Sequence, residues 1–265
     1  MEKLQSLKPI NIGGLSLCNN TQATQRAFCN NCKSDSFALN TKRVNPAVSN
    51  PLYNIPDEFL AEKFPKLLID KYTNQAYSLN VATSNPAISE ILNEAGAPLG
   101  IYPQNIKDSI DSHFIPSAKV SQKIMEKCNH NFSDRDYSTM LQASLLHDVG
   151  KVYIPDRILN KNGKLDPSER KVIDTHARLG YEALKSGGVS TPVLTLVKGH
   201  HNYNKAGADM PMVQILEIAD VYSALKEDRP YKKSFSDDKT FEILYNMADS
   251  GEFEHQYIDA LKRAV

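Results

Sequence analysis

The sequence lacks a net charge and any long apolar run. Its 265 residues include 31 Lys and Arg against 31 Asp and Glu, so the formal charge at pH 7 is zero. Because no overall field attracts a polyanion, a nucleic acid would need a local basic patch to bind. The sequence also has no apolar stretch of about 18 residues, the length that a membrane-spanning helix requires. Neither nucleic acid nor membrane is therefore expected as a partner.

The N-terminal residues lack the uninterrupted apolar segment of a secretory signal, because Asn11, Gly13 and Gly14 interrupt it. The segment Leu15–Cys18 resembles a lipid-attachment box. However, a large leucine directly precedes the cysteine, and no apolar segment stands before it. We therefore expect a cytoplasmic protein without a lipid anchor.

Cysteines are also scarce: Cys18, Cys29, Cys32 and Cys128 are the four in the chain. They are too few and too unevenly placed for a disulfide framework. Cys29 and Cys32 are spaced like one of the two cysteine pairs of a zinc ribbon, but no second pair follows them. Reduced thiols are the favoured interpretation.

Composition and periodicity divide the chain into three segments. Residues 1–55 are rich in Asn, Ser, Thr and Gln without an apolar period, so we expect them to be disordered. Residues 56–103 have apolar residues at helical spacing, with Asn85–Pro86 as a helix start and Gly96 as a stop. They are predicted to form a helical extension. Residues 104–265 are predicted to form the main domain.

The main domain is predicted to be all helical, because strand-type alternation is nearly absent from it. Ser133 and Asp136 form a variant capping box that opens a helix ending at His147–Asp148. Asp166–Glu169 opens another, predicted to carry His176 on an apolar face. Further helices are expected over 104–127 with an interruption at Pro116, over 191–199, over 212–225, and around 241–247 and 257–261.

A buried carboxylate gives the clearest chemical signal. Asp220 lies in a helix that is apolar almost all round, where an unpaired carboxylate would cost several kcal/mol. A cation must therefore meet it, either an Arg or Lys side chain or a metal ion. Imidazoles and carboxylates on separate helices could supply the other ligands of a metal. The predicted ligands are His147, Asp148, His176, His200, His201 and Asp220.

Most of these residues also have a structural interpretation. His147 could be a cation that a helix dipole favours, and His176 a hydrogen-bonded core histidine. His200 and His201 could be a surface pair. Asp148 argues against the first alternative, since a carboxylate at a helix C-terminus is disfavoured without a positive partner.

Six ligands suit two metal ions that share a carboxylate, and Asp148 is the natural bridge. A site of this kind activates a water molecule and holds the oxygens of a phosphoryl group, which predicts phosphoester or phosphodiester hydrolysis. Lys151 would neutralise charge on the phosphorus centre, with a surface lysine as the alternative.

These residues resemble the motifs of the HD superfamily of metal-dependent phosphohydrolases. The extended pattern resembles the HD-GYP branch, which hydrolyses cyclic di-GMP, and runs from about Asp108 to the C-terminus. It includes 147–151, 154–165, 219–225 and 229–231. The resemblance implies an HD-domain helical bundle with Asp148 and Lys151 as catalytic residues. It also implies that Lys151, Arg229 and Lys232 bind substrate phosphate.

The resemblance further implies two divalent metal ions and a small nucleotide substrate, most simply a cyclic dinucleotide of the cyclic di-GMP type. Histidine and aspartate ligands favour iron or manganese and also accept nickel, magnesium or zinc. The sequence leaves open a homodimer or a signalling partner.

Two departures from the family pattern define the alternatives. The Gly-Tyr-Pro loop that follows the histidine pair is missing from 202–211. An upstream His-Ser pair, which helps to hold a third metal in some members, falls at Pro116–Ser117, with His113 and Asp111 out of register. A third ion is therefore not expected. The alternatives are a signalling module that binds a nucleotide or a protein without hydrolysis, and a hydrolase of mononucleotides or other small phosphoesters.

Overall fold

The computed structural model describes residues 10–12, 15–17, 64–201, 210–228 and 233–265. The chain divides into two units, Met1–Asn54 and Ile55–Val265. In the first unit, β1 (Ile10–Ile12) pairs with β2 (Leu15–Leu17) as antiparallel strands, with Ile10 opposite Leu17. The rest of the segment predicted to be disordered lies outside the described residues. Its disorder and the boundaries of the three predicted segments stay predictions.

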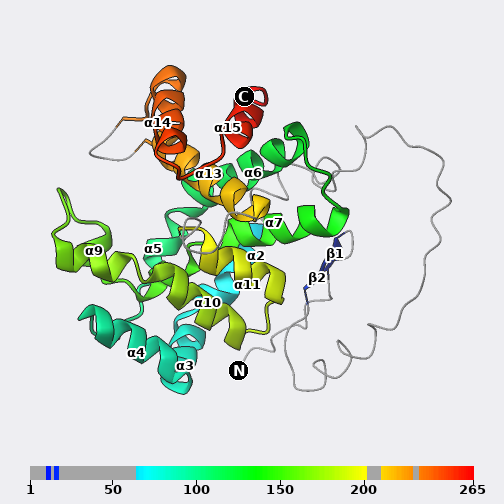
Figure 1. Cartoon of the computed structure of the whole chain (residues 1–265). Helices are drawn as coiled ribbons and strands as arrows, with labels where there is room; N and C mark the ends of the chain where they lie inside the picture. Colours follow the sequence, from blue (N-terminus) through cyan, green and yellow to red (C-terminus); the bar gives the residue numbers. More distant parts are fainter. Residues whose placement is uncertain (1–9, 13–14, 18–63, 202–209, 229–232) are drawn as a thin grey trace. The chain divides into compact units, whose positions relative to one another are not determined.

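All regular secondary structure described in the second unit is helical, which confirms the predicted all-α class (Figure 1). Its elements are α2 (Phe64–Thr73), α3 (Gln75–Ser84), α4 (Pro86–Ala95), α5 (Gln104–Lys107), the π-helix η2 (Ile110–Phe114), α6 (Ile115–Lys127), α7 (Asp134–Leu146), the 3-10 helix η3 (Val149–Tyr153), α8 (Asp156–Leu159), α9 (Pro167–Ile173), α10 (His176–Ser186), α11 (Thr191–Gly199), α13 (Pro211–Lys226), α14 (Asp237–Asp249) and α15 (His255–Lys262).

The predicted helix starts lie where the sequence places them. The Ser133 hydroxyl accepts from the backbone N–H of Asp136, and the Asp136 carboxylate accepts from that of Ser133, which completes the capping box of α7. Asp166 and Glu169 form the same reciprocal pair at α9. Because each pair satisfies backbone donors at a helix start, the start is fixed within a residue or so.

Two predicted helices are divided in the structure. The helix predicted through His176 is two helices, α9 and α10, because the Thr175 hydroxyl and backbone N–H both donate to Val172 O. The interruption predicted at Pro116 lies upstream of it, in η2. Pro116 itself stands in the first turn of α6, where a missing N–H is tolerated.

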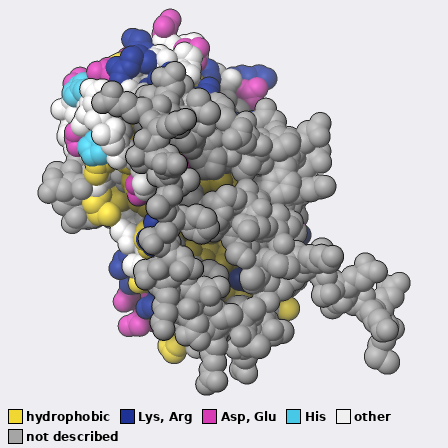
Figure 2. Space-filling model, turned by 90° about the vertical axis from the view of Figure 1, so that its right-hand side faces the viewer, with side chains coloured by type: hydrophobic (Ala, Val, Ile, Leu, Met, Phe, Trp, Pro, Cys, Tyr) yellow, Lys and Arg dark blue, Asp and Glu magenta, His cyan; other side chains and the backbone are white. Residues whose placement is uncertain are grey.

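The core of the second unit lies between α6, α7, α10, α11 and α13, which pack against one another. Figure 1 shows α14 and α15 at one end of these helices and α3 and α4 at the other. In the part of the chain drawn in colour in Figure 2, Lys and Arg side chains lie among Asp and Glu side chains, in keeping with the balanced composition. None of the described helices is long and apolar enough to cross a membrane.

A close backbone crossing joins η3 to α10. A Cβ atom on Gly150 would lie 1.9 Å from His176 O and 2.5 Å from Gly180 N, so only glycine fits there. The crossing holds the segment after His147–Asp148 directly against the first turn of α10. It therefore sets the distance between Asp148 and His176.

Candidate metal centre

The structure brings the six predicted ligands together, several of them from helix ends. His147 follows the last residue of α7, His176 begins α10, and His200 follows the last residue of α11. Asp220 comes from the middle of α13 and is 8% exposed. His147, Asp148, His176 and His200 are at most 3% exposed, whereas the His201 side chain is 39% exposed.

Asp148 lies at the centre, with its two oxygens directed to different partners. Oδ1 is 3.2 Å from His176 Nε2 and 3.9 Å from His200 Nε2. Oδ2 is 3.4 Å from His147 Nε2 and 2.5 Å from Lys151 Nζ. Each carboxylate oxygen thus serves a separate set of side chains, which is the arrangement that a bridging ligand needs.

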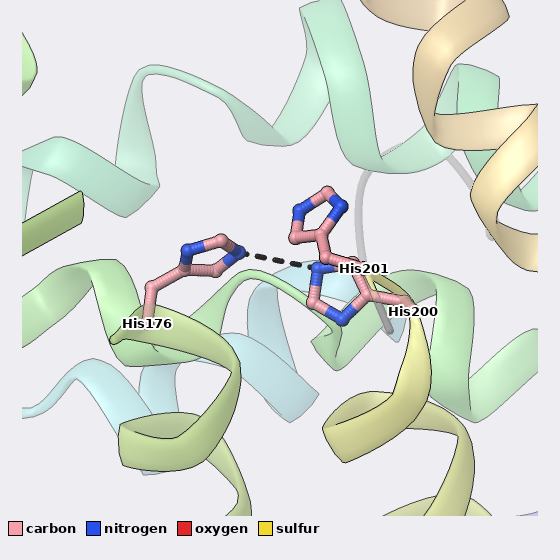
Figure 3. Close-up of side chains that lie close together, drawn as sticks. All are labelled: His176, His200 and His201. Carbon is pink, nitrogen blue, oxygen red and sulfur yellow. Dashed lines mark hydrogen bonds between the residues drawn. The ribbon is translucent and has the colours of Figure 1, made fainter. Parts of the chain in front are cut away.

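Backbone carbonyls orient three of the histidines. The Nδ1 atoms of His147, His176 and His200 lie 2.8, 2.7 and 2.7 Å from the carbonyl oxygens of Ser144, Ile173 and Val197, three residues earlier in each case. When Nδ1 carries the proton for this bond, Nε2 is left with its lone pair. Figure 3 shows His176 facing His200 and His201, with the Nε2 atoms of His176 and His200 3.2 Å apart.

The potential ligand atoms form two groups. One consists of His176, His200 and His201, and the other of His113, His147, Asp148 and Asp220, with all ligand atoms of a group within 4.8 Å of one another. His113 was not among the predicted ligands, because it is out of register with the family's upstream His-Ser pair, but the structure places it in the second group.

His113 is 4% exposed, and its Nε2 lies 2.8 Å from Asp220 Oδ1 and 3.6 Å from Asp148 Oδ2. It belongs to the π-helix η2, in which Phe114 N donates to Ser109 O five residues earlier. This wider turn rotates the side chains relative to an α-helical register. The one signal in the sequence is a histidine among the apolar residues Ile110, Phe114 and Ile115.

Of the predicted substrate-binding residues, the structure describes Lys151 alone. Its side chain is 24% exposed, and its ammonium group contacts Asp148. The other two, Arg229 and Lys232, lie outside the described residues. So do residues 202–209, which belong to the segment from which the Gly-Tyr-Pro loop is missing.

The pKa shifts of the cluster differ between the two groups of side chains. Burial raises the pKa of Asp148, but Lys151 and His147 outweigh it and hold this pKa well below its usual range. Burial lowers the pKa of His147, but Asp148 and Asp220 reverse this and raise it to about 10. Burial and His176 lower the pKa of His201 to about 4. His201 is therefore neutral at pH 7, and a bound metal ion would take the place of the proton that Asp148 and Asp220 favour on His147.

The side chains present fit a divalent metal. His147 Nε2 and Asp148 Oδ1 are buried without a hydrogen-bond partner among the described residues. Buried polar atoms seldom remain unpaired, and such an atom calls for an ion or a water molecule. Imidazole nitrogens with carboxylate oxygens are the ligands that iron, manganese and zinc accept.

Comparison with known proteins gives a family and several relatives. The HD domain family matches residues 103–256. The chain is 34% identical over 143 residues to the cyclic di-GMP phosphodiesterase response regulator RpfG of Xanthomonas campestris pv. campestris, covering 49% of this chain and 37% of the relative. It is 30% identical over 158 residues to the 3'3'-cGAMP-specific phosphodiesterase 1 of Vibrio cholerae, covering 54% and 36%. The chain thus matches little more than a third of each relative's length.

Among solved structures, the HD domain of the phosphodiesterase PgpH from L. monocytogenes is similar to 68% of this chain and 95% of its own. The TM-score is 0.46 and the sequence identity is 18%.

Proposed function

Because the chain belongs to the HD domain family, as the match over residues 103–256 shows, we propose that it is a metal-dependent phosphodiesterase that hydrolyses a cyclic dinucleotide. The family membership confirms the resemblance read from the sequence. The observation that carries the proposal is the buried convergence of histidine and aspartate side chains around Asp148. The relatives named for cyclic di-GMP and for 3'3'-cGAMP support the substrate class.

Two divalent ions are the proposed cofactors, with iron or manganese first and nickel, magnesium or zinc as alternatives. His176, His200 and His201 would hold one ion, and His113, His147 and Asp220 the other. Asp148 would serve both, because its oxygens face the two groups separately. When bound, such ions make a water nucleophilic at neutral pH and polarise the phosphoryl oxygens.

Lys151 is proposed to hold the substrate phosphate. Its ammonium group lies at the edge of the cluster, partly exposed, with Asp148 as its ion-pair partner. A flexible lysine in this position can turn toward a phosphate oxygen while its charge stays close to the reacting phosphorus. Arg229 and Lys232 stay predicted phosphate contacts.

The proposal predicts hydrolysis by the purified chain. We expect protein loaded with Mn²⁺ or Fe²⁺ to convert cyclic di-GMP or 3'3'-cGAMP to a linear dinucleotide or to mononucleotides, and a chelator to stop the reaction. Chromatography of the products from a panel of cyclic dinucleotides and mononucleotides measures this.

Bound metal without hydrolysis of any phosphoester in the panel would favour the non-hydrolytic signalling module. Hydrolysis of mononucleotides alone would favour the other alternative.

The assignment of His113 to one of the ions predicts a loss of metal affinity in His113→Ala. Since changing an outer partner of a ligand already costs about 10- to 100-fold in metal affinity, losing a ligand should cost at least about tenfold. Metal content after dialysis against dilute Mn²⁺ measures the effect. His130→Ala is the matched control, because His130 is exposed and stacks on Phe132. An unchanged metal content in His113→Ala would remove His113 from the site.

A further inference from the structure

His201 differs from the other three predicted ligand histidines in how it is oriented. His147, His176 and His200 each have a backbone carbonyl oxygen at Nδ1. The His201 ring instead lies between two carboxylates of α13. Its Nε2 is 3.8 Å from Asp220 Oδ2, and its Nδ1 is 4.0 Å from Glu217 Oε1. The group that faces His201 Nδ1 at this distance is thus a side-chain carboxylate.

Glu217 is a carboxylate without an assigned role. It precedes Asp220 by one turn of α13, so the two side chains share a face of the helix. The Glu217 side chain is 14% exposed, and its Oε2 is buried without a hydrogen-bond partner among the described residues. Neither group of ligand atoms includes it. An acceptor buried in this way is costly to keep unless a donor meets it.

We propose that Glu217 is a positioning residue for His201: it accepts a hydrogen bond from Nδ1–H and so keeps Nε2 available to the metal. This inference rests on the proposed function, because it takes His201 to be a ligand. The 4.0 Å separation is longer than a hydrogen bond, so the His201 side chain, which is 39% exposed, has to turn toward Glu217 to form one. A carboxylate behind a ligand histidine fixes its tautomer and raises its basicity.

The surroundings of Glu217 make it possible to distinguish the positioning role from a purely structural role by experiment. Burial, Asp220 and Glu252 raise the pKa of Glu217 to about 8, and among the described cations His201 alone lies within ion-pair distance of it. The charged form of Glu217 is therefore disfavoured in the metal-free protein, and replacing the side chain with glutamine should not lower the stability. A positioning residue predicts weaker metal binding with equal or higher metal-free stability, whereas a structural residue predicts lower metal-free stability.

The test compares Glu217→Gln, Glu217→Ala and the parent chain, with Glu252→Gln as a control that removes a nearby negative charge without touching His201. Mn²⁺ titration of the metal-free proteins gives affinity and stoichiometry, and thermal unfolding of the same samples gives stability. We expect Glu217→Ala to lose about 10- to 100-fold in affinity for one ion. Glu217→Gln, which keeps an acceptor oxygen, should lose less, and Glu252→Gln should bind as the parent does.

Parental affinity in Glu217→Ala would overturn the inference, as would a loss of affinity accompanied by a lower unfolding midpoint of metal-free Glu217→Gln. If Glu217→Ala does not fold, the nearly isosteric glutamine variant decides. A parent chain that binds no Mn²⁺ would overturn the proposed function itself. A parent that binds metal and hydrolyses substrate, beside an unaffected Glu217→Ala, overturns the positioning role alone.

Discussion

Replacing Asp148 with asparagine is expected to abolish hydrolysis, with a fall in rate of about 10³-fold or more. Loss of a single electrostatic group in an active site typically costs about 10²- to 10³-fold, and Asp148 serves two sets of ligands at once. Its Oδ1 faces His176 and its Oδ2 faces His147. Asparagine keeps one acceptor oxygen and puts an amide donor in place of the other. One of the two sets therefore loses its carboxylate oxygen.

Asp148→Asn should also lower the stability of the metal-free protein against unfolding. Asp148 is the buried counter-charge of Lys151, and with Asp220 it overcomes the effect of burial to hold the pKa of His147 near 10. Removing one partner of a buried ion pair leaves the other charge uncompensated, which typically costs about 3–5 kcal/mol. Since Lys151 is partly exposed and can turn to solvent, the cost here should lie below that range.

The measurements for Asp148→Asn are the hydrolysis rate of Mn²⁺-loaded protein, the metal content and the unfolding midpoint. Asp156→Asn is the matched control, because Asp156 is an exposed carboxylate at the start of α8 whose contact is with Asn160. The control should match the parent in activity and metal content. Full activity in Asp148→Asn would contradict the assignment of Asp148 as the shared ligand.

The helix starts and most of the site could be predicted because their signals are local. A capping box needs only residues three apart, and it places α7 and α9 directly. The candidate metal ligands were proposed from a chemical conflict, namely a carboxylate in an apolar helix. The same conflict applies to Glu217, which stands three residues before Asp220 in that helix, so its signal was present in the sequence.

The parts that could not be predicted depend on the exact turn of the backbone. His113 joins the cluster because η2 is a π-helix, and a single wider turn changes which side chains share a face. The division of α9 from α10 depends on the Thr175 hydroxyl competing for the Val172 carbonyl, which an apolar period does not reveal. The contact between η3 and α10 is equally invisible, since Gly150 and Gly180 are far apart in sequence.

That contact predicts the second large effect: Gly150→Ala should be strongly destabilised and should lose metal binding. The added Cβ would lie 1.9 Å from His176 O and 2.5 Å from Gly180 N, and both are backbone atoms that cannot rotate away. Overpacking a core typically costs about 1–3 kcal/mol, and a backbone clash belongs at or above the upper end. The strain is relieved only when η3 and α10 move apart, and this movement separates Asp148 from His176.

A graded series of glycine substitutions tests this explanation. At Gly180 the added Cβ would lie 3.2 Å from Gly150 N, so Gly180→Ala should cost less than Gly150→Ala. At Gly199 it would meet only Val213 methyl groups at 3.4 Å, and alanine favours a helix, so Gly199→Ala should be close to neutral. Unfolding midpoints and Mn²⁺ content of the three variants give the order.

A displacement of about 1 Å in an active site can cost about 10²-fold in rate, so Gly150→Ala should lose activity even at temperatures where it stays folded. Parental activity and stability in Gly150→Ala would show that the crossing does not set the distance between Asp148 and His176.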